Sequence, residues 1–600
     1  MSSFSILSVW PCIIGPLAAA LLVCGLDDLV PTLIFVWTRF VKRQIENTAS
    51  VADDEPLPER RIAIFVPCWK ESGVISNMVR HNLAALCYRN FDFFLGVYPN
   101  DDPTVQVANT LANSFRNVHV ALCPHDGPTS KADCLNWIYH RMLAHEEQHG
   151  GYFDTIVLHD AEDLIYPDAL STINRKRGEY AMVQVPVLPL DTPFREFTHG
   201  VYCDDFSEYQ TIDMHARQWC GSFVPSCGVG TGFAREILDR LATEREGQVF
   251  SPASLTEDYE IGVYIHKLRL PQLFAPVEQG RKGLAATREY FPRRARSAIR
   301  QRTRWVTGIA LQGWERYGWN GSWATRYWFW RDRKGLVTNP LSFLANIALL
   351  LGVADWTFGG ATHRPPALTI TNPTIAFLCY CTLTLQCLRL GLRMFCVGRL
   401  YSPVLAAGVP LRVLHGNFIN CCASLGAIWR YLDARLHGRP LVWLKTEHAY
   451  PHRDALPSHR REFADVLTGS GYITEDKLTG IQKEMSPNDD LADFLVRTGE
   501  LSDEDVCKII SLQSGLPWTR IDARSVKPRV VRSLPAHVEE RFRIVPFGLQ
   551  DGRLLIAGPR VPPSTMFDEL RSFTKLPVEF QLVPEHNYRE LRGLRSADHP

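Results

Sequence analysis

The chain has 600 residues, which is too long for one hydrophobic core and predicts about three to five structural units. Lys and Arg total 65 against 64 Asp and Glu, so the overall charge favours no nucleic-acid partner and none is expected. The 16 cysteines include no CxxC pair and suggest neither a zinc site nor a disulfide framework.

The amino-terminal segment is predicted to be a retained membrane anchor. Residues 4–26 carry no charge over 23 positions, enough to cross a hydrocarbon core, and no basic residue precedes them as it would in a signal peptide. A second apolar stretch, 29–37, is too short to span. Arg39, Lys42 and Arg43 follow it and place the next domain in the cytoplasm. A buried helical hairpin of a soluble protein is the alternative.

Residues 58–310 alternate predicted strands and helices, which indicates an α/β domain with a mainly parallel sheet. Ligands of such sheets bind beyond the carboxyl ends of the strands. Because the strands end in polar residues, we expect Glu71, Asp101, Asp102 and Asp160 to converge on one crevice. The four predicted strand segments are 61–71, 91–104, 118–124 and 155–163.

The last of these strands delivers three acidic residues to its carboxyl end, namely Asp160, Glu162 and Asp163. Carboxylates gathered at a strand end can bind a hard divalent cation, Mg²⁺ or Mn²⁺, together with the phosphate oxygens of a substrate. A solvated acidic turn is the alternative for this stretch taken alone.

Three further segments carry charge at predicted helix ends. Lys131 and Asn136 lie at the start of a helix, where a cation and free amides suit a phosphate. Glu257 and Asp258 open an amphipathic helix, although acidic residues are ordinary in any first helical turn. Arg304 lies in a strongly basic run, which is also typical of a membrane-surface helix.

The ordered carboxylates and the sequence QRTRW at 301–305 together resemble the processive family-2 glycosyltransferases, the group that contains the cellulose and hyaluronan synthases. The resemblance covers residues 58–310. It implies a GT-A fold and an inverting, hexosyltransferase-type enzyme that uses a nucleotide-sugar donor, a UDP-sugar, and a divalent metal ion.

The resemblance implies roles for individual residues on the donor side. Asp101 or Asp102 matches the aspartate that contacts the uracil base, and Lys131 matches a nucleotide-contacting lysine. Asp160 and Glu162 match the DxD pair, which holds diphosphate and metal.

On the acceptor side, Asp258 in the Thr256–Asp258 triplet matches the general base. Gln301, Arg304 and Trp305 match the QxxRW motif at the pyrophosphate and acceptor. The chemistry agrees, because Asp258 can take the proton of an acceptor hydroxyl and Arg304 can bind the departing diphosphate bidentately. Trp305 can stack on a sugar ring or belong to the core.

The DxD motif departs from the family pattern at its second position, which is Glu162 and not Asp. Either Glu162 or Asp163 can therefore be the second metal ligand. The stretch SCGVGTGF, 226–233, resembles the glycine-rich acceptor-site segment of the family. Its glycines would let the backbone approach a sugar closely, and they are Gly228, Gly230 and Gly232.

Residues 311–454 are predicted to form interfacial and transmembrane helices. Aromatic residues crowd 314–330, as in a segment at headgroup level. The stretches 341–354 and 374–388, each with its flanks, are spanning candidates. Polar residues and prolines interrupt 401–432, which is predicted to be interfacial. Two crossings return the carboxyl terminus to the cytoplasm; if 401–432 spans, the last domain lies outside.

Residues 455–600 turn soluble in composition and contain a near-repeat. The segment 463–478 recurs at 491–506, an offset of 28 residues, which suggests two helical pairs capped by Thr474 and Ser502. A β-hairpin with its turn at Asp551-Gly552 and two helices are expected after it.

This domain resembles the MshEN domain, which also occurs at the amino terminus of type II secretion ATPases and can bind cyclic di-GMP. The two units of that motif fit 462–485 and 491–513, although Glu462 and Met485 depart from it and Arg461 only lies beside the arginine position. A structural docking module is the alternative. The motif positions that are kept are Leu467, Gly471, Leu491, Leu495, Gly499 and Gln513.

The order of the predicted domains, 1–57, 58–310, 311–454 and 455–600, resembles the phage adsorption protein B-like glycosyltransferases. That group is associated with a secreted surface glycan and an outer-membrane partner. We therefore predict a bacterial inner-membrane enzyme that polymerises and exports an exopolysaccharide. Its expected partners are the lipid membrane, a glycan acceptor and an export partner, together with a second copy in a homodimer if two crossings do not suffice for translocation.

Three alternatives remain. The first is a transferase that adds one sugar to a lipid carrier, and the second is an inactive export or receptor scaffold. The third is a type II secretion ATPase component, which is disfavoured because the chain has no GxxxxGK[ST] phosphate loop.

Overall fold

The computed structural model describes residues 6–46, 57–275, 277–278, 284–362, 368, 370–441, 450, 462–486, 489–550 and 552–595. The chain forms two compact units. The first contains residues 1–75, 92–109 and 119–452, and the second contains 76–91, 110–118 and 453–600. Arg461 and the side chains of Lys42 and Arg43, which carried sequence predictions, lie outside the described part.

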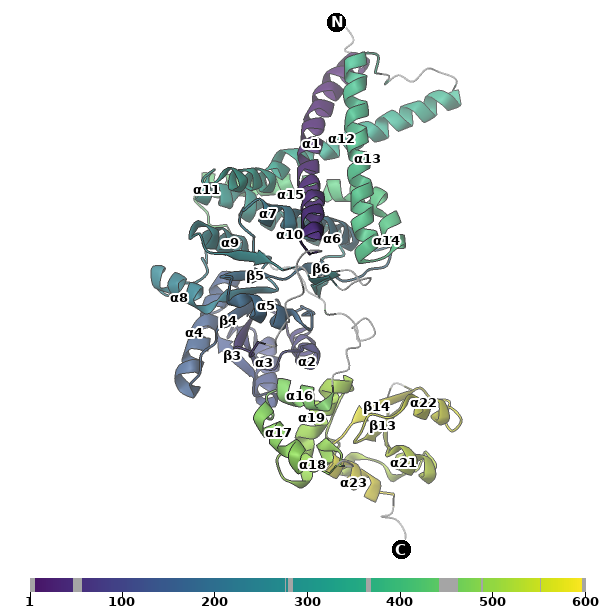
Figure 1. The fold of residues 1–600 in the computed structure, drawn as a ribbon. Coiled ribbons are helices and arrows are strands. Elements are labelled where there is room, and N and C mark those ends of the chain that lie inside the picture. Colours follow the sequence, from purple (N-terminus) through teal and green to yellow (C-terminus); the bar gives the residue numbers. More distant parts are fainter. Residues whose placement is uncertain are drawn as a thin grey trace. The chain divides into compact units, whose positions relative to one another are not determined.

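A sheet that includes β3, β4 and β5 lies in the first unit (Figure 1). It has seven strands in the order β3-β2-β1-β4-β7-β5-β8. β1 pairs with β4 and β5 with β8 in parallel, whereas β7 runs antiparallel to both β4 and β5. The sheet is thus mainly parallel, as predicted. Its strands are β1 Ile62–Pro67, β2 Phe91–Val97, β3 Val118–Leu122, β4 Thr155–Leu158, β5 Met182–Gln184, β7 Thr231–Ala234 and β8 Gln272–Phe274.

The central strands are buried because both faces of the sheet are covered. Every residue of β2 and β4 is buried, and apart from Asp92 and Thr155 these strands are apolar instead of alternating with polar residues. Phe65, Phe94, Ile156 and Phe233 share one buried cluster. The helices that alternate with the strands are α2 Ile75–Ala85, α3 Asp102–Ser114, α4 Lys131–His149, α5 Ala169–Arg177, α8 Arg235–Glu244 and α9 Glu257–Lys267.

Backbone hydrogen bonds bring the carboxyl ends of the first three strands to one edge of the sheet. Cys68 N donates to Gly96 O at 2.7 Å, and Cys123 N donates to Val97 O at 2.8 Å. β4 ends at the same edge because it is parallel to β1. The segments that carry the predicted site residues therefore leave the sheet together.

Two two-stranded sheets accompany the main one. β6 (Val187–Pro189) pairs in parallel with β11 (Thr287–Glu289), and β9 (Val277–Glu278) pairs antiparallel with β10 (Leu284–Ala285). The β6–β11 pairing brings the segment just before the basic run next to a strand 100 residues earlier in the chain. Between these strands lie α6 Phe197–Glu208, a π-helical turn Tyr209–Asp213 and α7 Met214–Trp219.

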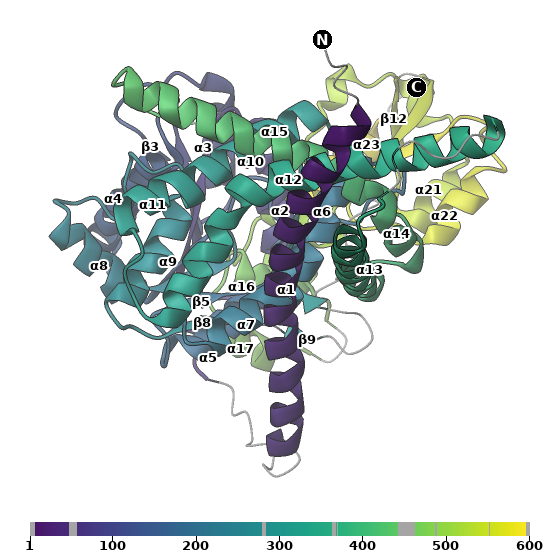
Figure 2. The same ribbon diagram turned by 90° about the horizontal axis from the view of Figure 1, so that it is seen from above.

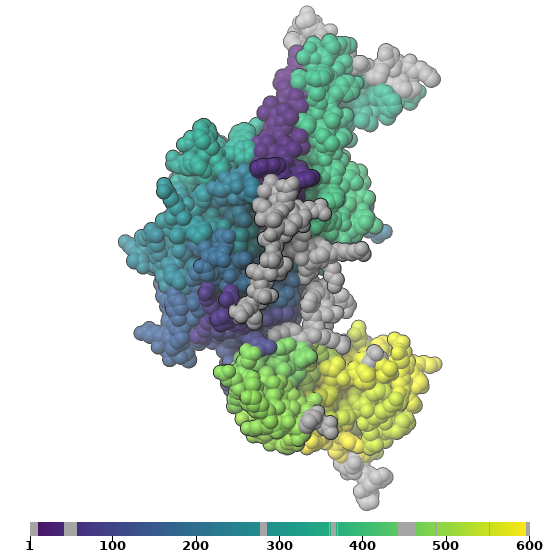
Figure 3. Space-filling view, in the orientation of Figure 1, coloured from purple at the N-terminus to yellow at the C-terminus, as the bar shows by residue number. Residues whose placement is uncertain are grey.

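The amino-terminal anchor is one continuous helix, α1 (Ile6–Glu46), so the predicted separation of a spanning piece from a short second piece is wrong. Asp27 and Asp28 do not end the helix because they form ion pairs with Lys334 and Arg331. Arg389 also pairs with Asp28. Paired carboxylates are tolerated in an apolar helix, whereas unpaired ones are not. α1 lies along α13 (Figure 3).

Among the described residues, three helices are long and apolar enough to cross a membrane by length and composition, and they overlap the predicted spans. They are 10–40 within α1, 323–358 within α12 (Trp323–Thr362) and α13 (Pro373–Leu400). The aromatic side chains of the segment 314–330 are partly exposed and partly buried in a core cluster. Trp323 is 84% exposed, as expected for a lipid-headgroup residue, but Trp328 is only 1% exposed and packs in a core cluster with Phe223 and Tyr259.

The interrupted stretch after α13 forms α14 (Pro403–Ala407) and α15 (Val409–Leu436), and α15 lies across α10 and α12 (Figure 2). Its polar residues contact other helices of the same unit. Arg412 donates to both carboxylate oxygens of Asp204 in α6, at 2.9 and 2.7 Å. Asn420 accepts a hydrogen bond from Arg302 at 2.7 Å. The interruptions thus fasten α15 to the catalytic domain.

The carboxyl-terminal part begins with four helices that preserve the 28-residue offset of the sequence repeat. The cap predictions differ in outcome, because the Ser502 side chain accepts from Asp505 N while the Thr474 side chain makes no capping bond. Gly471 and Gly499, at equivalent turns, have φ of 75° and 76°. The helices are α16 Phe463–Gly469, α17 Glu475–Glu484, α18 Leu491–Arg497 and α19 Asp503–Ser514.

A three-stranded sheet follows these helices, in the order β12-β13-β14. β12 (Val545–Gln550) and β13 (Arg553–Gly558) form the predicted hairpin, with Gly552 at φ 74°. β14 (Val578–Leu582) pairs in parallel with β13 and was not predicted. The two predicted helices are α22 (Ser564–Leu570) and α23 (Glu585–Gly593), and the shorter α20 (Pro528–Val531) and α21 (Ala536–Phe542) precede the sheet.

The Arg412–Asp204 pair predicts a large loss of stability for Arg412→Ala. Both side chains are almost fully buried, and burial raises the pKa of the Asp204 carboxyl, so removal of the arginine leaves an unpaired buried acid. A loss of about 3–5 kcal/mol is expected. Thermal unfolding of the detergent-solubilised protein measures it. Arg435→Ala, which removes an exposed pair with Glu315, should change stability by less than about 1 kcal/mol.

Candidate active site

A cavity opens at the edge where the strands end. Its wall combines residues after β1, β2 and β4, the start of α4, the glycine-rich segment before β7, the start of α9, and α10 (Ala295–Trp305). Nine of the predicted site residues line it: Glu71, Lys131, Asp160, Glu162, Glu257, Asp258, Gln301, Arg304 and Trp305. Residues from 71 to 305 therefore meet at one place; the parallel sheet predicts this for Glu71, Asp160 and Glu162, and the family resemblance implies it for the site residues of α4, α9 and α10.

The acidic cluster after β4 divides between the cavity and the core. Asp160 and Glu162 line the cavity. Asp163 is fully buried, with its Oδ2 2.7 Å from His159 Nδ1 and accepting a hydrogen bond from Asp160 N at 3.0 Å. Asp163 thus closes the turn that presents the other two carboxylates, and Glu162 is the one that faces the cavity with Asp160.

Lys131, the first residue of α4, forms an ion pair with Asp160, with Nζ 2.5 Å from Oδ1. Burial alone would lower the pKa of Lys131, but Asp160 and Glu257 raise it, so the ammonium stays charged. Lys131 Nζ also donates to Gly228 O at 3.4 Å. Asn136 does not line the cavity. Its side chain donates to Phe250 O and accepts from Phe250 N, so the predicted phosphate contact of Asn136 is wrong.

Asp101 and Asp102, predicted to contact the base, are not among the residues that line the cavity. Asp101 Oδ2 accepts a hydrogen bond from Lys70 N at 2.5 Å, and Lys70 has a φ of 55°. Thr104 Oγ1 accepts from Glu71 N at 3.0 Å. The start of α3 therefore holds the turn that places Glu71 at the cavity. The base contact itself stays a prediction.

Glu257 and Asp258 occupy the first turn of α9; Glu257 is buried and Asp258 is partly buried. Burial, together with the charge of Asp258, raises the pKa of the Glu257 carboxyl to about 7, while Lys131 opposes the shift. Burial likewise raises the pKa of Asp258, against the pull of Lys131 and Arg304. Asp258 Oδ1 accepts from Tyr259 N at 2.7 Å. The pair forms an acid centre beside two cations.

The helix with the QxxRW motif holds the turn before Asp258. Arg304 faces the cavity, whereas Arg302 bonds Asp205 at 2.8 Å on the other side. A π-helical turn, Val306–Gln312, follows, and Gln312 Oε1 accepts from Leu255 N at 3.1 Å. A Cβ on Gly308 would lie 2.4 Å from Thr256 Oγ1. Both the acid turn and Arg304 are thus positioned by one helix.

Trp305 lines the cavity, and it also packs edge-on against Tyr202 with ring centroids 6.1 Å apart. The core contact is thus observed, and stacking on a sugar ring stays a prediction. Sequence reasoning missed several other lining residues. Trp69 and Tyr98 follow strands β1 and β2, where a strand-end rule could have found them, but Glu289 and Phe291 reach the cavity only through the β6–β11 pairing.

Comparison with known proteins identifies the parts of the chain. Residues 58–308 match the description "Glycosyltransferase like family 2", and residues 514–593 match "MshEN domain". Bacteriophage adsorption protein B of Escherichia coli (strain K12) is 31% identical over 567 residues, which are 90% of this chain and 75% of that protein. This chain belongs to the bacteriophage adsorption protein B family. Within that family it carries a family-2 glycosyltransferase domain and is an enzyme of that class.

Solved structures share parts of the fold. Mannosyltransferase PcManGT from Pyrobaculum calidifontis, solved with GDP-Man and Mn²⁺, is 18% identical over 69% of this chain and 99% of its own, with a TM-score of 0.43. MshE, solved with "cdg", is 23% identical over 23% of this chain and 99% of its own, with a TM-score of 0.20. Because both scores are below 0.5, the assignment rests on the sequence matches. The predicted class, an α/β GT-A domain with apolar helices and a carboxyl-terminal α+β MshEN domain, is confirmed.

The contact between the glycine-rich segment and the acid turn predicts a loss of activity in Gly228→Ala. A Cβ at Gly228 would lie 2.7 Å from Asp258 Oδ2 and would displace that carboxylate. Displacement of a catalytic group by about 1 Å costs about 10²-fold in rate. Gly221→Ala is the matched control, because Gly221 also has positive φ but has open space around its Cβ position. Nucleotide release from the sugar donor measures both; equal loss in both variants would contradict the contact.

The raised pKa of Glu257 predicts a pH-dependent gain of stability in Glu257→Gln. The folded protein keeps a proton on Glu257 up to about pH 7, whereas the unfolded chain releases it near the ordinary value of 4.5. Stability of the parent therefore falls as pH rises through this window, by up to about 3 kcal/mol. In the absence of divalent metal, the unfolding midpoint of Glu257→Gln relative to that of the parent should therefore rise between about pH 5 and about pH 8. Glu179→Gln, at an exposed position, should show no such shift.

Proposed function

We propose that the chain is a metal-dependent, inverting glycosyltransferase that passes a sugar from a UDP-linked donor to a growing surface glycan. The observation that carries the proposal is the cavity, where Asp160 and Glu162 lie with Lys131, Arg304 and Asp258. Oxygen donors at a strand end, an acid that can act as a base, and two cations are the groups that this reaction needs.

The donor side of the proposal uses the carboxylates after β4. Asp160 and Glu162 would hold Mg²⁺ or Mn²⁺, since these hard cations prefer oxygen ligands and share them with diphosphate. The metal would supply positive charge to the diphosphate. Lys131, already 2.5 Å from Asp160, and Arg304 would stabilise the negative charge that develops as the bond from sugar carbon to phosphate oxygen breaks.

The acceptor side uses the acid turn of α9. Asp258 would take the proton from the acceptor hydroxyl as its oxygen attacks the sugar carbon from the face opposite the diphosphate, which inverts that carbon. Glu257 would keep a second proton nearby, because burial holds the pKa of its carboxyl at about 7. The Gly228 backbone would let the acceptor approach Asp258, since its Cβ position is 2.7 Å from Asp258 Oδ2.

The helices support a membrane-bound, exporting enzyme. α1 precedes the catalytic domain, and α12 and α13 follow it, so two crossings would keep the catalytic and carboxyl-terminal domains on one side. Arg39 at the end of the first candidate span supports the cytoplasmic side of a bacterial inner membrane. We further propose that the glycan passes through the membrane helices, in a homodimer if two crossings form too narrow a path, to an outer-membrane partner.

The carboxyl-terminal domain is proposed to bind cyclic di-GMP and to regulate transfer. Its two helical units preserve equivalent turns at Gly471 and Gly499, and the motif leucines Leu467 and Leu495 are fully buried at equivalent helices. A docking module without ligand is the second candidate, favoured by the departures at Glu462 and Met485.

Asp258→Asn is expected to abolish sugar transfer, by about 10²–10⁴-fold, because an amide cannot accept the hydroxyl proton. UDP release by the purified protein with Mn²⁺ and a panel of UDP-sugars measures it, and removal of the metal with EDTA should have a similar effect. Asp168→Asn, an exposed position, is the matched control. Release that is unchanged in Asp258→Asn would contradict the proposed base, and absence of release from every donor would favour the scaffold. Product length separates a polymerase from a single-sugar transferase.

Cyclic di-GMP is expected to bind the full-length protein and to raise donor turnover. Gln513→Ala should weaken binding by about tenfold, the effect of about one charge-assisted hydrogen bond, whereas Gln482→Ala, an exposed glutamine of α17, should not. Calorimetry with the dinucleotide measures binding. Turnover that the dinucleotide leaves unchanged, with no heat of binding, would leave the docking module as the function of this domain.

A further inference from the structure

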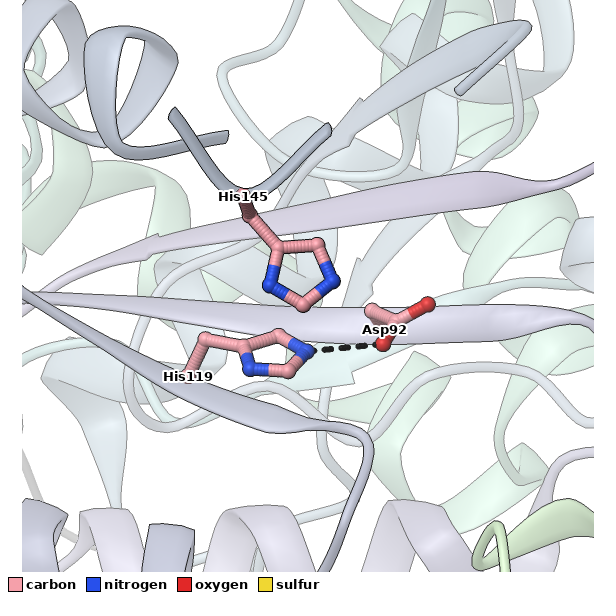
Figure 4. A group of neighbouring side chains, drawn as sticks. All are labelled: Asp92, His119 and His145. Atoms are coloured by element: carbon pink, nitrogen blue, oxygen red, sulfur yellow. Dashed lines mark hydrogen bonds and ion pairs between the residues drawn. The ribbon is translucent and has the colours of Figure 1, made fainter. Parts of the chain in front are cut away.

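A compact group of metal-ligand side chains lies in the catalytic domain away from the cavity. Asp92, His119 and His145 each offer one ligand atom, and these atoms all lie within 4.8 Å of one another. Asp92 Oδ1 is 2.8 Å from His119 Nε2, and the two imidazole rings are 4.2 Å apart between centroids. Figure 4 shows the three side chains facing one another from β2, β3 and α4.

The place of this cluster in the fold separates it from the catalytic site. Asp92 is the second residue of β2 and His119 is the second residue of β3, so both lie at the amino ends of their strands. The cavity lies at the carboxyl ends. His145 belongs to the last part of α4, the helix that begins with Lys131 at the cavity. The cluster and the cavity therefore lie at opposite ends of one helix.

The surroundings of the cluster are those of a built site. Asp92 is 8% and His145 is 6% exposed. Arg61 Nε donates to Asp92 Oδ2 at 3.2 Å, which orients the carboxylate with its other oxygen toward His119. Phe94 packs against both imidazoles, with ring centroids 4.9 Å from His119 and 5.8 Å from His145. A carboxylate oriented by a neighbour and an apolar wall are typical of the second layer around a metal.

His145 is held as a neutral imidazole with its lone pair on Nε2. His145 Nε2 lies 3.4 Å from the Arg61 NH2 group, which can only donate, so Nε2 is the acceptor and the one hydrogen of the neutral ring is on Nδ1. His145 Nδ1 is buried and makes no hydrogen bond among the described residues, so no second hydrogen bond holds the ring in place. A neutral imidazole is the form that binds a metal, and His145 would bind through Nε2 in place of its long contact with Arg61.

We propose that Asp92, His119 and His145 form a binding site for one divalent transition-metal ion of the zinc class. Two imidazoles and one carboxylate are the ligands of tetrahedral Zn²⁺ sites, with a water in the fourth position, whereas Mg²⁺ prefers oxygen ligands alone. His119 would bind through Nε2 once its hydrogen moves to Nδ1. The site does not depend on the proposed sugar transfer.

The proposed ion would clip the end of α4 to the two strands beside it. It would join three elements that also meet there through the His119–Asp92 contact, the Arg61 bonds, aromatic packing and the hydrogen bond from Arg141 Nε to Val120 O. Because α4 carries Lys131 at its other end, the ion would also steady the helix that supplies a cation to the cavity. Arg61 is the fixed positive charge beside the site and remains on the second oxygen of Asp92.

The test uses the full-length, EDTA-treated protein in detergent with millimolar Mg²⁺ present to occupy the catalytic carboxylates. Zn²⁺ titrated into this protein should bind at one equivalent per chain, and Co²⁺ should give the absorption bands of tetrahedral coordination. His119→Gln and His145→Gln should each lose that equivalent. His140→Gln, which changes an exposed histidine of the same helix, should retain it. The double variant Asp160→Asn, Glu162→Gln should retain it as well.

Two results would overturn the proposal: wild-type protein that binds no Zn²⁺ under these conditions, or an equivalent that survives in His119→Gln and His145→Gln. X-ray absorption of the Zn²⁺-loaded parent protein gives an answer even when a variant fails to fold. Scattering from two imidazoles per zinc supports the site, and its absence contradicts it. Zn²⁺ should also raise the unfolding midpoint of the parent and of His140→Gln, and leave that of His145→Gln unchanged.

Discussion

Ion pairs between buried and partly buried side chains from distant segments hold the first unit together. Arg217 contacts Asp332, Arg412 contacts Asp204, and Arg302 contacts Asp205, each across about a hundred residues or more of sequence. A buried charge without its partner costs several kcal/mol, so each pair allows only one arrangement of the helices that carry it. Ion pairs therefore join the apolar helices to the sheet domain, although the outer surfaces of these helices are apolar.

The same constraint shapes the catalytic cavity, but there the charges are not balanced. Asp160, Glu257 and Asp258 face Lys131 and Arg304, so the acids outnumber the cations, and burial raises the pKa values of Glu257 and Asp258. A divalent ion would add the missing positive charge and a nucleotide diphosphate would bring its own negative charge. The imbalance is what a site needs if it is to bind metal and donor together and still keep one acid ready to accept a proton.

The rigidity of the cavity comes from contacts that leave no space for a side chain. Gly228 lies against Asp258 and Gly308 lies against Thr256, while Gln312 binds the backbone of the preceding loop. These contacts connect the acid turn, the glycine-rich segment and the QxxRW helix into one body. At the far end of α4, the Asp92, His119 and His145 cluster would add a metal link to the same body. The chemistry and its support are thus carried by the same few elements.

The sequence alone determined the parallel sheet, the approach of Glu71 and the acidic cluster after β4 at one edge, and the repeat of two helical pairs, while the family resemblance named most of the other site residues. These follow from local rules: strands end in polar residues, parallel strands end at one edge, and a 28-residue offset preserves turns at Gly471 and Gly499.

The sequence could not decide between Glu162 and Asp163, because only the hydrogen bonds of Asp163 show which carboxylate closes the turn. The sequence also could not predict that α1 continues through Asp27 and Asp28, since the ion-pair partners of these residues lie about 300 residues away. No spacing motif in the sequence marks Asp92, His119 and His145, because their side chains meet only when two strands and a helix pack. Only the tertiary structure decided these points, because contacts between charges or ligand atoms from distant segments produce no periodic pattern in the sequence.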